Sequence, residues 1–345
     1  MLTSRNKLAC LLLGILFSMG ALAADQVAVN PAHPDRHVVV PGDTLWDIAG
    51  KFLRDPWQWP NVWHVNPQIE NPHLIYPGDI ITLTYVNGRP ILSLQRGSLV
   101  KLSPQVRSTP LSAAIPVIPL DAISAFLTRP FIMDKDALEA APYVVYFPDE
   151  HLVGAKDLRA YVRSIDNTDN GRFDVVRPGG EYRDADTNEL LGYEALFIGN
   201  ADLLKTGDPA TVDITNSELE VQKGDRLFPI SREVQLENFH PKAPDQEVKG
   251  SIISVLNGVT QIGQYNVVVL DRGTDNGLQP GDVLAIDHRG RTVRDTVTEV
   301  SDDTVTLPDE PSGTLLVFRT FPRVSFGLVM DATRAIHVRD RVRNP

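Results

Sequence analysis

The sequence has little cysteine, few basic residues and no long apolar run. Its 345 residues include a single cysteine, Cys10, which excludes a disulfide-stabilised scaffold. Lys and Arg number 33 against 44 Asp and Glu, and this formal net charge of −11 disfavours nucleic acid as a partner, because phosphates are bound mainly by Lys and Arg. The 42% apolar content is that of a globular protein, and the length predicts at least two domains.

The N-terminal segment has the pattern of a secretory signal peptide. Two basic residues precede the apolar run Leu8 to Met19, and Ala21-Leu22-Ala23 matches an A-x-A cleavage site. The run is too short to span a bilayer, and Cys10 lies near its start, which argues against a lipoprotein. We expect residues 1–23 to be removed and the exported chain to be periplasmic, free of cysteine and of net charge −13; an uncleaved membrane anchor is the alternative.

The densest local signals lie in residues 36–86. His37 to Val40 predicts a short strand, which the turn Pro41-Gly42-Asp43 ends. Thr44 to Asp47 fits a capping box at the start of a helix. The apolar face of that helix is formed by Leu45, Ile48, Ala49, Phe52 and Leu53.

A second short helix and a second strand complete this module. Asp55-Pro56 predicts the start of the helix, and Tyr76-Pro77-Gly78-Asp79 predicts a turn into the strand Ile80 to Leu83. The four tryptophans of the chain all fall in this module. Helical spacing predicts that Trp46, Trp59 and Trp63 are core residues, and Trp57 is left as a core residue or a surface platform.

These residues resemble a LysM domain. The match runs through Gly42 to Ala49, Asn66 and Leu74 to Gly78. The resemblance implies a small βααβ fold that binds N-acetylglucosamine-containing glycans, chiefly peptidoglycan, in a shallow groove and without a metal or cofactor. The implied groove residues are Gly42, Asp43, Thr44 and Leu45 on one wall and Leu74, Ile75, Tyr76 and Pro77 on the other. The alternative is that the glycines only form turns and that Thr44 only caps the helix.

The rest of the chain has mainly the pattern of strands. Scattered prolines predict a tether over residues 87–120, part of which should dock on a neighbour because it contains Ile115, Val117, Ile118 and Leu120. Residues 121–245 predict a β-rich region with short helices at 121–127 and 134–140, strands at 143–147, 158–163 and 191–198, and a turn at Pro178-Gly179-Gly180. Residues 246–345 predict a C-terminal β domain, with one of its strands at 267–270. We expect an α+β protein, with a small βααβ module followed by small barrels or sandwiches.

Two segments of the β region share a local pattern that contains a Gly-Asp turn. Val221 to Leu227 and Leu278 to Leu284 each place Gly-Asp before an apolar strand. Two β-units of similar build would explain the similarity. A turn that is common before strands would explain it equally well, because Tyr76 to Ile80 has the same pattern in another fold.

The arrangement of an exported LysM module and a long β-rich region resembles the type IV pilus secretin-associated protein family (TsaP), whose C-terminal region is related to the flagellar protein FlgT. The resemblance is carried by Val100 to Pro104, Ile118 to Leu120, Ala141 to Val144 and Gly273 to Gly281. It implies a non-catalytic periplasmic scaffold that anchors the outer-membrane secretin ring to the cell wall and forms an oligomer through that ring. An envelope protein without a pilus partner is a further alternative.

The main competing class is a peptidoglycan hydrolase, or a hydrolase activator with a LysM targeting module. The exported chain lacks a cysteine nucleophile, and the sequence has no H-E-x-x-H, G-x-S-x-G or phosphate-binding glycine motif. We expect no metal site, because the histidines are dispersed: His33, His37, His64, His73, His151, His240, His288 and His337. Sequence spacing does not test a glycosidase carboxylate pair, because such a pair is set by distance in space.

Overall fold

The structure is a computed structural model, and it describes residues 27–63, 75–95, 114–128, 132–165, 171–230, 239–256, 261–297 and 302–345. The expected signal peptide, Asn66 and most of the expected tether lie outside these residues. The chain divides into two compact units, residues 1–114 and 115–345. Among the described helices, none is long and apolar enough to cross a membrane.

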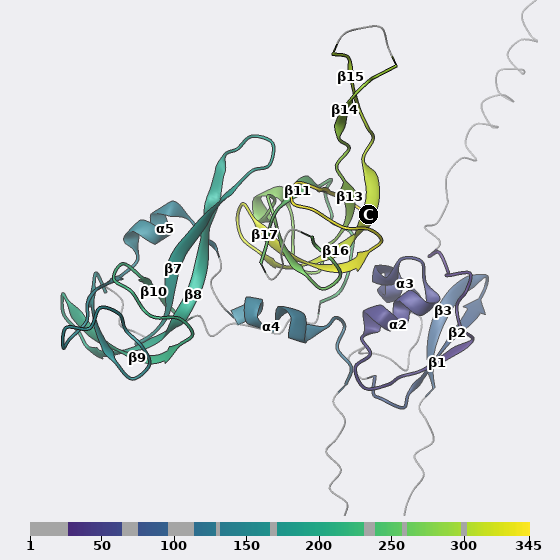
Figure 1. The fold of residues 1–345 in the computed structure, drawn as a ribbon. Helices are drawn as coiled ribbons and strands as arrows, with labels where there is room; N and C mark the ends of the chain where they lie inside the picture. Colours follow the sequence, from purple (N-terminus) through teal and green to yellow (C-terminus); the bar gives the residue numbers. More distant parts are fainter. Residues whose placement is uncertain are drawn as a thin grey trace, which may run out of the picture. The chain divides into compact units, whose positions relative to one another are not determined.

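The first unit is a three-stranded antiparallel sheet with helices on one face (Figure 1). Its elements are β1 (Arg36–Val38), α2 (Leu45–Phe52), the 3-10 turn η1 (Pro56–Gln58), α3 (Trp59–Trp63), β2 (Ile80–Val86) and β3 (Arg89–Gln95). Strand β3 falls inside the stretch predicted to be a tether, and it pairs with β2 from Ile80↔Gln95 to Val86↔Arg89. The prediction missed it because Gly88 and Pro90 resemble a linker, whereas they belong to a hairpin.

The core of this module follows the predicted helical pattern. All five residues of the expected apolar face of α2 are buried. Trp46, Trp59 and Trp63 are also buried, and the exposed fraction of each is at most 4%. Trp59 and Trp63 pack edge to face with ring centroids 5.9 Å apart. Trp57 is only partly buried. The prediction of three core tryptophans is therefore confirmed.

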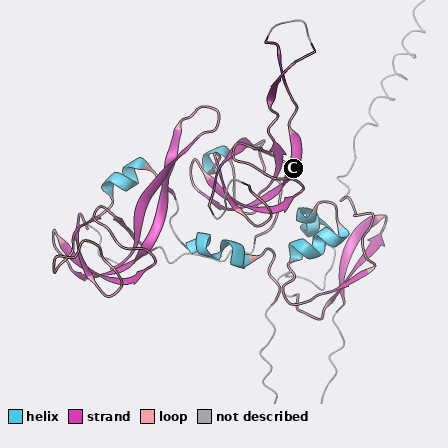
Figure 2. Ribbon diagram, in the orientation of Figure 1, coloured by secondary structure: helices cyan, strands magenta, loops and turns pink. Residues whose placement is uncertain are grey.

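The second unit begins with two short helices and a sheet that closes on itself (Figure 2). The elements are α4 (Leu120–Thr128), β4 (Ile132–Met133), α5 (Lys135–Ala140), β5 (Tyr143–Tyr146), β6 (Arg159–Arg163), β7 (Arg172–Arg183), β8 (Leu190–Lys205), β9 (Ala210–Ser217) and β10 (Arg226–Pro229). Strand β9 pairs with both β6 and β8, so six strands form a ring in the order β5-β6-β9-β8-β7-β10, with β4 added at β8. We call this ring the first β-unit.

One feature of this region differs from the prediction, and a second agrees with it. Pro178-Gly179-Gly180 was predicted to be a turn, but it lies inside β7 at an irregularity of the register between Pro178 and Glu181. A bulge accommodates proline and glycine within a strand, which explains the error. Ile115, Val117 and Ile118 are buried, as expected for a stretch that docks on a neighbour.

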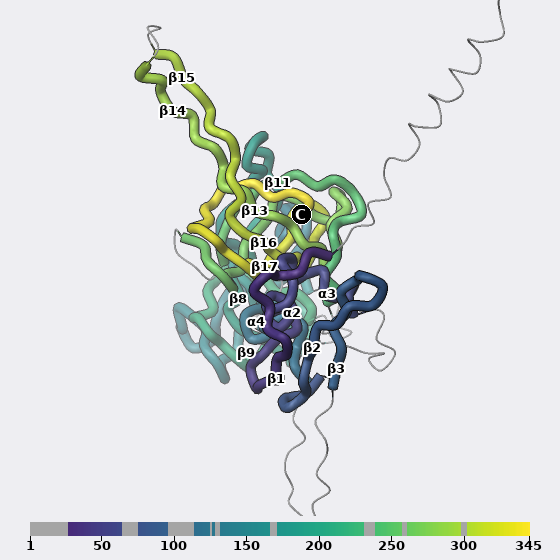
Figure 3. Tube along the Cα trace, turned by 90° about the vertical axis from the view of Figure 1, so that its right-hand side faces the viewer, coloured from purple at the N-terminus to yellow at the C-terminus, as the bar shows by residue number. Residues whose placement is uncertain are grey.

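A closed six-stranded barrel follows, which we call the second β-unit. It consists of β11 (Lys249–Val255), β12 (Val267–Leu270), β13 (Val283–His288), β16 (Glu310–Thr320), β17 (Ser325–Ala332) and β18 (Arg341–Arg343). The hairpin of β14 (Thr292–Arg294) and β15 (Thr304–Thr306) projects from this barrel in the two views of Figure 1 and Figure 3. The predicted boundary at 245–246 falls between Pro229, which ends the first β-unit, and Lys249, which begins the second.

The two β-units have the same topology. Numbered along the chain within each unit, the strands follow the ring order 1-2-5-4-3-6 in both. Gly199 in strand 4 of the first β-unit and Gly313 in strand 4 of the second occupy the same tight position, because a Cβ on either would lie 2.1 Å from a backbone oxygen of strand 5. The isolated bridges Gly154↔Val221 and Ile262↔Ile336 also correspond. Two units of similar build therefore exist.

The Gly-Asp similarity itself has a local cause. Five turns have the same hydrogen bond, in which the carboxylate of an Asp accepts the N–H of the residue three positions earlier: Val40 to Asp43 at 3.0 Å, Tyr76 to Asp79 at 3.0 Å, Gln222 to Asp225 at 2.7 Å, Gln279 to Asp282 at 2.8 Å and His337 to Asp340 at 2.8 Å. By position in the ring, the counterpart of Asp225 is Asp340 and not Asp282, because Asp225 and Asp340 both precede strand 6.

Two glycine-to-alanine changes in the LysM-like module should have opposite effects on its stability. Gly78 has φ +98, so Gly78→Ala should destabilise the module by about 1–2 kcal/mol through the left-handed backbone alone. Gly50 lies in α2, and a Cβ there would meet Pro56 Cγ at 3.4 Å, so Gly50→Ala should stabilise it by about 0.5–1 kcal/mol.

Urea unfolding followed by tryptophan fluorescence measures both effects in the whole chain, because all four tryptophans lie in this module. Equal midpoints for the two variants would show that the backbone at Gly78 is not held in this conformation.

Candidate glycan-binding site

The two expected walls of the groove are turns that both adjoin Val39, one through hydrogen bonds and the other along the chain. The N–H of Val39 donates to the carbonyl of Asp79, and the carbonyl of Val39 accepts the N–H of Gly78, both at 2.8 Å. The first turn, Val40 to Asp43, follows Val39 directly, so the two turns lie side by side at one end of the sheet. Leu74, the remaining member of the second wall, lies outside the described residues.

Burial divides the expected groove residues into two groups. Thr44, Leu45 and Ile75 are buried at 4%, 1% and 0% exposure, so their side chains support the walls from the core. Gly42 is exposed, and Asp43, Tyr76 and Pro77 are partly exposed. The surface that a sugar ring can reach therefore consists of the Gly42 turn and the Tyr76-Pro77 turn.

Thr44 caps helix α2, as the alternative interpretation of this residue predicted. Its hydroxyl oxygen accepts the N–H of Asp47 at 3.1 Å, and its O–H donates to the Asp47 carboxylate at 2.8 Å. This arrangement caps α2 and satisfies one of the free N–H groups at the helix start. Thr44 thus fixes the angle at which the first turn enters the helix.

Asp43 connects the first turn to both neighbouring elements. Its carboxylate accepts the N–H of Val40 at 3.0 Å and a hydrogen bond from His37 Nε2 at 2.7 Å, and Lys51 Nζ lies 3.8 Å away. Burial raises the pKa of Asp43, but the hydrogen bonds from His37 and Val40 and the charge of Lys51 outweigh it, and the net pKa is lowered. The ionised carboxylate therefore holds β1, the turn and α2 together at neutral pH.

The first turn is open to a ligand. Gly42 has φ +95, and, apart from Gly42 itself and its two chain neighbours, no described residue has an atom within 4 Å of the position where a Cβ would be. Acetamido groups are recognised by backbone donors and acceptors, which can approach closely only where a side chain is missing. The geometry thus leaves room for an acetamido group beside the backbone of Gly42.

Two exposed valines beside the first turn were not among the expected site residues. Val38 and Val40 are 47% and 49% exposed, whereas Val39 between them is 1% exposed. Strand alternation at His37 to Val40 would have identified them, because only every second side chain of the strand faces the core. They extend the apolar surface next to Gly42.

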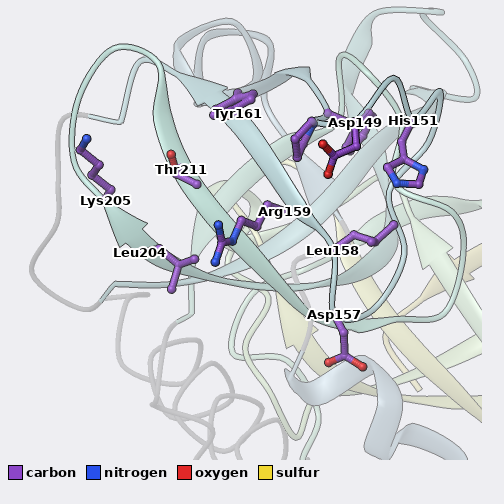
Figure 4. Close-up of a pocket in the computed structure, with 11 residues that line it drawn as sticks. Asp149, His151, Asp157, Leu158, Arg159, Tyr161, Leu204, Lys205 and Thr211 are labelled. Carbon is purple, nitrogen blue, oxygen red and sulfur yellow. The ribbon is translucent and has the colours of Figure 1, made fainter.

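A separate cavity of about 620 Å³ lies in the first β-unit (Figure 4). Its wall comes from β6, β8, β9 and the loop before β6, and Asp149 lies beside His151 at one end, away from Arg159 and Leu204. Its labelled residues include two carboxylates, Asp149 and Asp157. No local sequence pattern indicates this cavity, because its residues come from segments that only the closure of the ring brings together.

Comparison with known proteins agrees with the N-terminal geometry. The family model described as "LysM domain" matches residues 37–84. A stretch of 55 residues is 42% identical to the uncharacterized protein YqbP of Bacillus subtilis strain 168, and the match covers 13% of this chain and 25% of that protein. The chain thus spans about a quarter of the length of this relative, and the likeness concerns a small part of each protein. Residues 37–84 form a LysM domain, which implies binding of peptidoglycan or a related carbohydrate.

Proposed function

We propose that this protein is a non-catalytic periplasmic scaffold whose LysM domain holds the N-acetylglucosamine units of peptidoglycan. The observation that carries the proposal is the pair of open turns on either side of Val39, within the residues that match the LysM family. The Gly42 turn would receive the acetamido group, and Tyr76 and Pro77 would pack against the sugar ring. The exported location and the absence of catalysis are part of the proposal.

The binding partner at the other end of the scaffold is proposed to be the secretin ring of a type IV pilus machine. The support is the resemblance of the two-part architecture to the TsaP family, together with two β-units that offer a large surface beyond the glycan site. A single shallow glycan site of micromolar to millimolar affinity corresponds to about −8 to −4 kcal/mol, so a ring of copies would supply the anchoring strength. Affinity capture from envelope membranes with mass spectrometry tests this partner.

The glycan site predicts different behaviour for two matched glycine variants. Gly42→Leu should reduce pelleting of the chain with purified sacculi by about tenfold, because the side chain fills the space that the acetamido group needs. Gly88→Leu is the control, because Gly88 also has a positive φ and a Cβ position that no described residue beyond its chain neighbours approaches within 4 Å, but it lies in the β2–β3 turn. Both changes should introduce similar backbone strain, because both glycines have a positive φ. Unfolding followed by tryptophan fluorescence should therefore give similar stabilities for the two variants.

Equal pelleting of the two variants would move the binding site away from the Gly42 turn. Tyr76→Ala provides an independent measurement on the second wall, with the 58% exposed Tyr85 changed to Ala as its control.

The lowered pKa of Asp43 predicts an acid-dependent contribution to the stability of the LysM domain. Because the folded-state pKa lies below the ordinary value of 3.8, the stabilisation is fully present above that value and is lost as pH falls through the folded-state pKa. The stability difference between the natural chain and Asp43→Asn should therefore be constant near pH 6 and shrink towards about pH 3.

Urea unfolding followed by tryptophan fluorescence at a series of pH values measures this difference. Asp35→Asn, at an exposed residue of the same unit, is the control for the loss of one negative charge. A flat difference for Asp43→Asn would mean that its carboxylate does not hold the turn.

The alternative function is a peptidoglycan hydrolase or a hydrolase activator. The observation in its favour is the cavity of the first β-unit with Asp149 and Asp157 in its wall. The scaffold proposal predicts no release of soluble muropeptides from labelled sacculi, with or without added zinc. Release that Asp149→Asn or Asp157→Asn abolishes would replace the scaffold with an enzyme.

A further inference from the structure

The second β-unit brings together two histidines that are far apart in the sequence. His288 Nδ1 lies 3.0 Å from Asp340 Oδ1, and His337 Nδ1 lies 4.0 Å from Asp340 Oδ2. The two imidazole rings are tilted, with centroids 5.5 Å apart. One donor atom from each of the three residues lies within 4.8 Å of the other two.

The carboxylate at the centre of this cluster is held in place by the backbone. Asp340 is 3% exposed on its side chain, and it accepts the N–H of His337 at 2.8 Å and the N–H of Arg289 at 3.1 Å. This is the fifth of the Asp turns described above, and it has Arg339 at φ +79 where the other four turns have glycine. The carboxylate oxygens are thus already aimed at the two histidines.

His337 has a nitrogen without a partner. Its Nδ1 atom is shielded from solvent and makes no hydrogen bond with any described residue, although the ring as a whole is 45% exposed. The 4.0 Å to Asp340 is too long for a hydrogen bond. It is close to the separation of about 3.4 Å that two ligands have around a tetrahedral ion with bonds of about 2.1 Å.

The first β-unit shows what occupies the corresponding positions when no histidine is present. The register of strands 3 and 6 places Arg177 where the second β-unit has His288, and Gln222 where it has His337. Arg177 donates two hydrogen bonds, at 2.8 and 2.9 Å, to Asp225, the counterpart of Asp340. A guanidinium supplies a permanent positive charge and has no lone pair, whereas an imidazole can offer a lone pair to a cation.

We propose that His288, His337 and Asp340 bind one divalent transition-metal ion of the zinc class, with a water molecule completing a four-coordinate site. Two imidazole nitrogens and one carboxylate oxygen suit zinc and its neighbours, whereas calcium and magnesium prefer oxygen ligands alone. The ion takes the place that the Arg177 guanidinium has in the first β-unit. It joins the end of β13 to the turn before β18.

The surroundings permit a cation at this position. Arg289 and Arg341 flank the cluster in sequence, but both pair with Asp186 from the β7–β8 turn, at 3.6 Å for Arg289 and 2.5 Å for Arg341. Both guanidinium groups therefore lie against Asp186, whose carboxylate offsets part of their charge. His288 and His337 are 34% and 45% exposed, so an ion can reach the site from solvent.

Calorimetric titration of the chelator-treated chain with Zn²⁺ tests the site. One equivalent should bind, and His288→Gln and His337→Gln should each weaken binding by at least about tenfold. The exposed His151 is the control, and His151→Gln should bind as the natural chain does. An excess of Mg²⁺ or Ca²⁺ should not compete.

Two further readouts separate loss of a ligand from loss of the fold. The ring resonances of His288 and His337 should shift or broaden with Zn²⁺ in the natural chain, and circular dichroism should show that both glutamine variants keep the β structure. Zn²⁺ binding that is absent, or that folded His288→Gln and His337→Gln retain unchanged, would overturn the proposal. The result is independent of glycan binding, because the LysM domain is a separate unit.

Discussion

The hydrogen bond between an Asp carboxylate and the N–H three residues earlier sets the start of the main elements in both units. Strand β2 begins one residue after Asp79, β10 after Asp225, β13 after Asp282 and β18 after Asp340, while Asp43 is followed by the Thr44 cap of α2. Each turn needs a left-handed residue just before the Asp, which is Gly42, Gly78, Gly224, Gly281 or Arg339. A short local pattern thus decides where the chain reverses and where the sheet ladder resumes.

The same turn has different electrostatics at different sites, because each carboxylate has further acceptor capacity beyond the turn hydrogen bond. At Asp43, His37 donates a hydrogen bond and Lys51 lies 3.8 Å away, so the pKa of Asp43 is lowered. At Asp282 the nearest cation, Lys242, is 3.9 Å away, and burial raises the pKa instead. Asp225 has a bidentate arginine, and Asp340 has a histidine. The turn is therefore a fixed structural part, and its cationic partner determines which chemistry the position can support.

The sequence predicted what depends on neighbours along the chain and missed what depends on strand pairing. The buried face of α2, the three core tryptophans and the strands β5, β6 and β12 follow from periodicity. Strand β3 and the interior of β7 were misread, because proline and glycine in a hairpin or bulge look like a linker or turn. The topology shared by the two β-units has few matching residues, such as Gly199 with Gly313 and Asp225 with Asp340, and only the ring order identifies these pairs.

The candidate sites divide in the same way. The two turns of the glycan site each carry a local motif, and only their shared pairing with Val39 had to come from the structure. His288 and His337 carry no motif, because the ring order and not the sequence places strand 3 beside strand 6. In the proposed scaffold, the glycan is held by neutral backbone and apolar groups, so the net charge of −13 expected for the exported chain neither attracts nor repels it. The Asp carboxylates instead stabilise the turns of the fold, and in the histidine cluster the carboxylate of Asp340 would offset part of the charge of one added cation.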